Sequence, residues 1–241
     1  IAHRTVLERM PHVADPSETQ KLLAGADRFL SRLLLKAIHP GALAIAKQLQ
    51  QDYDFSGINL VLPTTVFDER HVLDLDGTEV QLIYVGPCHQ IGDTIVYLPK
   101  ERVLFAGDVI FRECTPMGWT GSYEKWLKII DLIIALDPEV IVPGHGPVCG
   151  LEGAMEMKAY LDYVREESSS FFARGMSALD AAKRIDLGPY SAWNAPARVY
   201  LNVERAYREF RHEVEDQPWD TAKSFDHIYK VAKSRGIRVE F

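Results

Sequence analysis

Two short apolar runs, each next to an acidic or imidazole side chain, constrain the fold of this chain more than any other feature. The runs cover residues 94–98 and 103–106, are rich in β-branched and aromatic residues, and are bounded by Gly and Pro. Both faces of each run are apolar, so we expect two strands of a sheet that is covered on both sides. His89 lies just before the first run, and Asp108 lies just after the second.

A third run repeats this arrangement further along the chain. Residues 140–142 read as a buried strand, and His145 follows in a Pro-Gly-His-Gly-Pro turn. A single His in a turn is most often a surface or capping residue. Three strand ends that each carry a His or an Asp instead indicate a metal site, because neutral imidazole and carboxylate are the usual ligands of zinc and similar ions. The sequence therefore predicts that His89, Asp108 and His145 converge.

These strand ends resemble the metallo-β-lactamase superfamily. The stretches GPCH, FAGD and PGHGP are similar to the third, fourth and fifth motifs of that family, and the resemblance covers most of residues 58–212. It implies an α/β fold, the four-layer αβ/βα sandwich, in which a sheet is packed against helices. It also implies a metal-activated hydroxide that attacks an ester, amide, thioester or lactam.

The same resemblance implies a role for each of the three residues. His89 is expected to bind the first metal, Asp108 to bridge the two metals, and His145 to bind the second. Asp108 is thus the residue of this chain on which catalysis is expected to depend most. The expected cofactor is zinc, two ions in a complete site, with iron or manganese as alternatives.

One motif of the family is missing from the sequence. HxHxDH, which supplies four groups to the two metals, does not occur, and no two of the eight histidines are separated by a single residue. The chain begins with Ile1, and residues 1–10 resemble what usually follows HxHxDH, namely the end of a strand and a short helix. We therefore expect the downstream part of a longer protein, with an incomplete N-terminal half, weak metal binding and no activity of its own. The alternative is a chain that has lost the motif and the metal.

Three functions remain open at this point. The first is a metal-dependent hydrolase that is complete only with upstream HxHxDH sequence. The second is an iron-dependent oxidoreductase on the same fold, of the sulfur dioxygenase type. The third is a non-catalytic domain that has lost the metal site, and its function would then be binding.

Composition narrows the classes of partner. The 241 residues carry a formal net charge of −7, which argues against a nucleic-acid backbone as the partner. The expected partner is a small-molecule substrate. No apolar run approaches the roughly 20 residues that span a bilayer, so no membrane association is expected. Three cysteines without a CxxC motif fit a reducing compartment, and we expect a cytoplasmic protein. A homodimer is a further expectation.

We expect a metallo-β-lactamase-like domain over residues 1–212, with a helical insertion at 17–53, and a helical extension at 213–241. The insertion should be split by Pro40 and Gly41. It would pack on the core, form a lid over the site, or contact a second subunit. The C-terminal extension would pack back on the domain or on a second subunit.

Local patterns predict the remaining elements. Asp76-Gly77 is a strong hairpin signal. The expected strands and helices are strands at 58–62, 65–75 and 78–85, and helices at 122–136, 152–173, 178–185 and 196–212.

Several residues near the predicted site have two readings. Asp93 would orient a metal-binding His or, the reading we favour, simply form a turn. Cys88 and Cys149 read as small packing residues. Trp119, in the loop 111–121 after Asp108, would either pack down or set substrate specificity.

Overall fold

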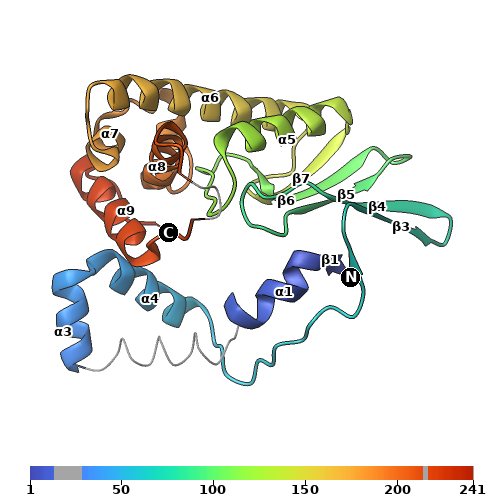
Figure 1. The fold of residues 1–241 in the computed structure, drawn as a ribbon, viewed down its shortest axis with the longest axis horizontal. Coiled ribbons are helices and arrows are strands. Elements are labelled where there is room, and N and C mark those ends of the chain that lie inside the picture. The colour runs from blue at the N-terminus through green and yellow to red at the C-terminus, as the bar shows by residue number, and fades with distance from the viewer. Residues whose placement is uncertain (14–28, 214–216, 241) are drawn as a thin grey trace.

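The computed structural model describes residues 1–13, 29–213 and 217–240, and its fold is a mixed α/β arrangement (Figure 1). A five-stranded sheet has the order β3-β4-β5-β6-β7, and a separate parallel pair joins β1 to β2. The strands are β1 (Ala2–His3), β2 (Val66–Phe67), β3 (Arg70–Leu75), β4 (Thr78–Tyr84), β5 (Thr94–Leu98), β6 (Val103–Phe111) and β7 (Val140–His145). The α-helices are α1 (Arg4–Val13), α3 (Phe29–Ile38), α4 (Pro40–Asp52), α5 (Tyr123–Ala135), α6 (Leu151–Ala173), α7 (Ala178–Arg184), α8 (Val199–Phe210) and α9 (Thr221–Arg235), with short 3-10 helices at Gly188–Ala192 and Pro196–Arg198.

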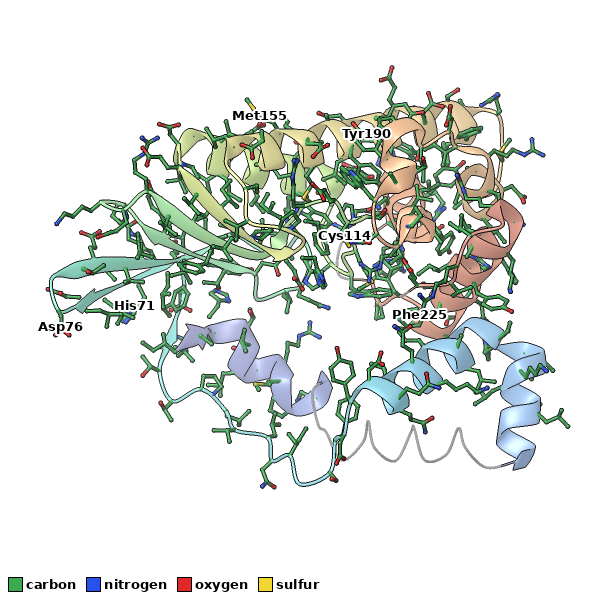
Figure 2. The ribbon with its side chains drawn as sticks, turned by 180° about the vertical axis from the view of Figure 1, so that it is seen from behind. His71, Asp76, Cys114, Met155, Tyr190 and Phe225 are labelled. Atoms are coloured by element: carbon green, nitrogen blue, oxygen red, sulfur yellow. The ribbon has the colours of Figure 1, made fainter. Side chains whose placement is uncertain are left out.

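The hairpin of β3 and β4 confirms the prediction made from the Asp76-Gly77 turn. Both turn residues have positive φ, 52° and 86°, as a two-residue turn between right-twisted strands requires. The Asp74 carboxylate accepts a hydrogen bond of 2.7 Å from the Gly77 N–H and so closes the turn. The turn lies at the end of the sheet that is remote from the helices, where Asp76 is labelled in Figure 2.

Helix α5 connects the parallel strands β6 and β7 and confirms the helix predicted at 122–136. Ser122 begins it as an N-cap, since its hydroxyl accepts a hydrogen bond from the Lys125 N–H. Trp126, Ile130 and Ile133 form its buried stripe and are fully shielded from solvent. The predicted helices at 152–173 and 178–185 correspond to α6 and α7, and the one at 196–212 begins as a 3-10 turn and continues as α8.

The two faces of the sheet are covered unequally. Strand register places Tyr97, Leu104 and Ile141 in one row, which is buried on the face that α5 and α6 cover. The neighbouring row on the other face includes Val96 and Phe105, and Phe105 is 45% exposed. Helix α1 lies beneath the sheet on that side (Figure 1). Helices cover one face fully, whereas the described elements cover the other face, where cover was also expected, only in part.

The strand predicted at 58–62 is also wrong. This segment has no strand assignment, and Val61 is 77% exposed. A short β-branched run reads as a strand from its composition, but a strand forms only where a neighbouring strand accepts its backbone hydrogen bonds.

Helices α3 and α4 belong to the predicted insertion, whose residues 17–28 lie outside the described part of the chain. The predicted break at Pro40-Gly41 is confirmed, because α3 ends at Ile38 and α4 begins at Pro40. The buried carboxylate of Asp226 on α9 accepts a 2.8 Å hydrogen bond from the Gly41 N–H and lies 2.7 Å from His39 Nδ1. The insertion therefore packs on the C-terminal helix. None of the described helices has the length and apolar character needed to cross a membrane.

Candidate metal centre

His89 lies in the loop between β4 and β5, and the Asp93 carboxylate holds this loop in place. Its Oδ2 accepts hydrogen bonds from the backbone N–H groups of Cys88 (2.9 Å) and His89 (2.6 Å), and from the Cys88 thiol (2.9 Å). The Gln90 N–H donates to the same carboxylate at 3.0 Å. Asp93 is thus the turn residue that we favoured, and it positions His89 through the backbone.

Asp108 lies inside β6 instead of after it. The strand continues to Phe111, three residues beyond the site, and its register to β7 shifts on both sides of Gly107. Gly107 has φ +54°, a conformation that glycine adopts without steric cost. This irregularity ends the apolar pattern early, and the sequence therefore predicted too short a strand.

His145 ends β7, between two glycines that allow close approach of the neighbouring strand. A Cβ on Gly144 would lie 2.0 Å from Asp108 Oδ1, and Gly146 has φ +91°. The His145 ring stacks on the buried ring of Phe111, with centroids 5.0 Å apart and planes 11° apart. Phe111 also contacts His89 edge-on at 6.2 Å, so one aromatic ring supports both imidazoles.

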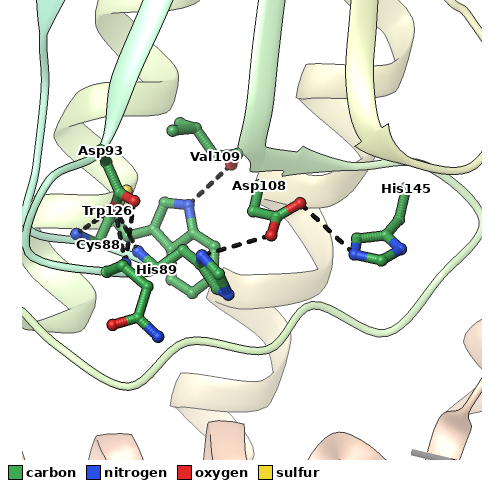
Figure 3. Close-up of polar contacts among 8 residues, drawn as sticks. Cys88, His89, Asp93, Asp108, Val109, Trp126 and His145 are labelled. Carbon is green, nitrogen blue, oxygen red and sulfur yellow. Dashed lines mark hydrogen bonds and ion pairs between the residues drawn. The ribbon is translucent and has the colours of Figure 1, made fainter. Parts of the chain in front are cut away.

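The three predicted residues lie together, with Asp108 in the middle (Figure 3). His89 Nδ1 is 3.5 Å from Asp108 Oδ2, and His145 Nε2 is 3.5 Å from Asp108 Oδ1. Each carboxylate oxygen thus faces a different imidazole. Within the described residues, no group of three or more His, Cys, Asp and Glu side chains is placed to hold a metal ion on its own. The three side chains form a row in which the Asp108 carboxylate lies between the two imidazoles.

Burial sets the charge of His89. Desolvation lowers the pKa of its imidazole, and the nearby Asp108 and Asp93 carboxylates oppose this effect only in part. The ring is therefore neutral at neutral pH, which is the form that can bind a metal ion. A carboxylate between two imidazole nitrogens is a donor set that suits zinc and related divalent ions.

A cavity of about 570 Å³ opens beside His89 and Asp108. Its opposite wall is helix α1, through Val6, Arg9 and Met10. The sequence predicted this helix but not its place at the site, because nothing local indicates a contact across more than 80 residues. Phe111 was also missed as a support for the histidines, although its apolar neighbours Val109 and Ile110 are a signal that the strand continues.

The two cysteines near the site behave as packing residues. Cys88 is fully buried, and burial raises the pKa of its thiol well above the usual value. Desolvation also raises the pKa of the Cys149 thiol. Protonated thiols are poor metal ligands and poor nucleophiles, so neither residue extends the candidate centre.

Comparison with known families identifies the fold. The sequence profile of the metallo-beta-lactamase superfamily matches residues 17–145, which is more than half of the chain. The chain belongs to this superfamily. This match confirms the resemblance seen in the three strand-end motifs. Membership of the superfamily is consistent with a metal-dependent hydrolase.

Two curated proteins match parts of the chain. The 2,4-dinitroanisole O-demethylase subunit alpha of Nocardioides sp. (strain JS1661) is 37% identical over 82 residues, which are 32% of this chain and 24% of that protein. The metallo-beta-lactamase type 2 of Bacteroides fragilis is 30% identical over 115 residues, 46% of each chain. This chain thus spans less than half of the length of either relative.

Two solved structures share the fold of this chain. A metallo-beta-lactamase family protein from Thermus thermophilus has a TM-score of 0.50 at 19% sequence identity. The match covers 74% of this chain and 62% of the Thermus chain. A stereoselective inverting sec-alkylsulfatase from Pseudomonas sp. also has a TM-score of 0.50, at 15% sequence identity. This match covers 68% of this chain and 28% of the sulfatase chain.

Proposed function

We propose that this chain supplies one side of a two-metal hydrolytic centre, in which His89 binds one ion, His145 binds the other and Asp108 bridges them. The observation that carries the proposal is the placement of one imidazole nitrogen 3.5 Å from each Asp108 oxygen. A carboxylate with two oxygens and a full negative charge suits the bridging position.

The chemistry divides between the ions and the chain. Ions held there would lower the pKa of a bound water and polarise the bond to be cleaved. Asp108 supplies negative charge at the centre, and the neutral His89 supplies a nitrogen lone pair. The Phe111 ring fixes the orientation of both imidazoles. Helix α1 forms one wall of the cavity through Val6, Arg9 and Met10.

Each ion would have only two protein ligands from this chain, with Asp108 counted for both, whereas a catalytic zinc site has about three. We propose that an HxHxDH segment upstream completes the centre. Residues 1–241 alone should then bind metal weakly and hydrolyse nothing. The reaction proposed for the complete protein is hydrolysis of an ester, amide, thioester or lactam in a small molecule. One relative is named a 2,4-dinitroanisole O-demethylase subunit, so cleavage of an aryl ether is also tested.

The proposal is tested by calorimetric metal titration of residues 1–241 and of the same chain carrying its upstream sequence. Asp108→Asn should remove metal binding from both proteins, because it takes away the shared ligand. His212→Ala is the matched control and should change nothing, because this exposed histidine lines a different cavity that includes none of the three residues of the centre. Chromogenic ester, lactam and aryl ether substrates then report activity, which only the longer protein should show.

Each alternative function gives a different result. Iron instead of zinc in the longer protein, together with oxygen consumption, would support the oxidoreductase. A longer protein that lacks HxHxDH and binds no metal would support the non-catalytic domain. Tight stoichiometric metal binding that survives Asp108→Asn would show that the ligands have been assigned wrongly.

A further inference from the structure

A second cavity adjoins the one beside the candidate centre. It has a volume of about 520 Å³ and shares Arg9, Gln90 and Ile91 with the first. Its aromatic lining consists of Trp119, Trp219 and Phe225, and we call this second cavity the aromatic cleft. The loop after β6 and the C-terminal region thus reach the neighbourhood of the centre from distant parts of the sequence.

The three aromatic rings are arranged around Trp119. Trp219 meets it edge to face, with centroids 5.7 Å apart and planes 89° apart. Phe225 meets it at 5.9 Å and 67°. The Arg208 guanidinium covers one face of Trp219 at 4.6 Å, which holds that ring in position. All three rings are only partly buried, so they offer an apolar, aromatic surface to a ligand.

Charge in the aromatic cleft comes from a single residue. Among the described residues that line it, Arg9 alone has a charged side chain, and the polar remainder consists of neutral residues such as Thr120 and Gln217. No hydrogen bond or ion pair with another described residue engages the Arg9 guanidinium. Arg9 is an exposed cation, and the acids nearest to it in the two cavities, Asp93 and Asp108, line only the first cavity. The aromatic cleft therefore favours an anionic group on the ligand.

The N-terminal end of helix α1 and the preceding His3 are held by contacts with the sheet and its loops. The His3 ring stacks on Tyr84 with centroids 3.6 Å apart, and Arg4 forms an ion pair of 2.6 Å with Asp68. Gly92 packs so closely on Val6 that a Cβ there would lie 2.5 Å from its side chain. These contacts fix the helix beside the His89 loop, and Arg9 therefore stays between the centre and the aromatic cleft.

We infer that the aromatic cleft is a specificity pocket for an aromatic ring and that Arg9 binds an anionic oxygen group between this ring and the bond to be cleaved. The inference rests on the proposed function for the position of that bond. It narrows the substrate to an aromatic compound with an anionic substituent. Trp119, Trp219 and Arg9 are then the residues that select it.

The test is calorimetric binding of 2-naphthoate to residues 1–241 in the presence of EDTA, so that no metal contributes. The neutral 2-naphthylmethanol and the aliphatic anion octanoate are compared with it. We expect 2-naphthoate to bind most tightly. Arg9→Gln should weaken its binding about three- to fivefold, as for an exposed ion pair, and Trp119→Leu should weaken it roughly tenfold.

Arg184→Gln is the matched control, since it removes a cation from α7 and should leave binding unchanged. Each variant is first checked for a cooperative thermal transition. If Trp119→Leu does not fold, Trp219→Leu and the surface variant Arg9→Gln decide the result.

Three outcomes would overturn the inference: no saturable binding of 2-naphthoate, equal binding of octanoate, or binding that neither Arg9→Gln nor the tryptophan variants reduce. The proposed hydrolytic centre fails independently, through the metal titration of Asp108→Asn. That variant should still bind 2-naphthoate in EDTA, because the aromatic cleft does not include Asp108.

Discussion

Gly144→Ala is expected to lower the free energy of unfolding by about 2–3 kcal/mol, the cost of overpacking a filled space. The added Cβ would lie 2.0 Å from Asp108 Oδ1, 2.6 Å from the Gly107 carbonyl carbon and 2.7 Å from the Asp108 N. Two of these atoms belong to the backbone and cannot rotate away. The strand β6 must shift relative to β7, and Asp108 then moves away from His145.

Urea unfolding followed by circular dichroism measures this loss, and Gly175→Ala serves as the control. Gly175 has φ +70° but no atom within 4 Å of an added Cβ, so it reports only the cost of a left-handed backbone conformation for alanine, about 1 kcal/mol. Equal losses in the two variants would show that Gly144 and Asp108 are not packed as described.

Asp93→Asn is expected to cost about 2–3 kcal/mol, because buried donors would lose a charged acceptor. The carboxylate accepts from three backbone N–H groups and one thiol in the His89 loop. An amide of the same size presents an NH₂ group to some of these donors instead of an oxygen. The loop should loosen, and His89 should lose its fixed distance from Asp108.

The matched control for this change is Asp74→Asn in the β3–β4 turn. Asp74 is exposed and accepts one backbone hydrogen bond, from the Gly77 N–H, so its loss should be well below that of Asp93. Urea unfolding gives both values, and the histidine ring signals in NMR report the movement of His89. A loss at Asp93 no greater than that at Asp74 would contradict the role of Asp93 in positioning the loop.

The elements that were predicted correctly are those whose signals are local. Asp76-Gly77 defines a hairpin turn by itself, and Ser122 with its apolar stripe defines α5 by itself. His89, Asp108 and His145 were found because each stands at or near the end of a run that pairs with the next one in the sheet. Pairing of β6 with β7 then brings Asp108 and His145 together.

The features that were missed depend on segments far apart in the sequence. Residues 58–62 have strand composition but no neighbouring strand to pair with in the described part of the chain. The position of Arg9 follows from contacts of α1 with residues such as Asp68 and Tyr84. Trp119 and Trp219 are 100 residues apart in the sequence and meet only in the folded chain. The residue pattern of neither segment therefore predicts the aromatic cleft.

The most direct test of the central claim is anomalous X-ray scattering at the zinc edge from crystals of residues 1–241 soaked in saturating zinc. We expect one peak between Asp108 and His89 and a second between Asp108 and His145, each about 2 Å from its ligand atoms. Zinc density at other histidines with none beside Asp108 would contradict the assignment of His89, Asp108 and His145 as the metal centre.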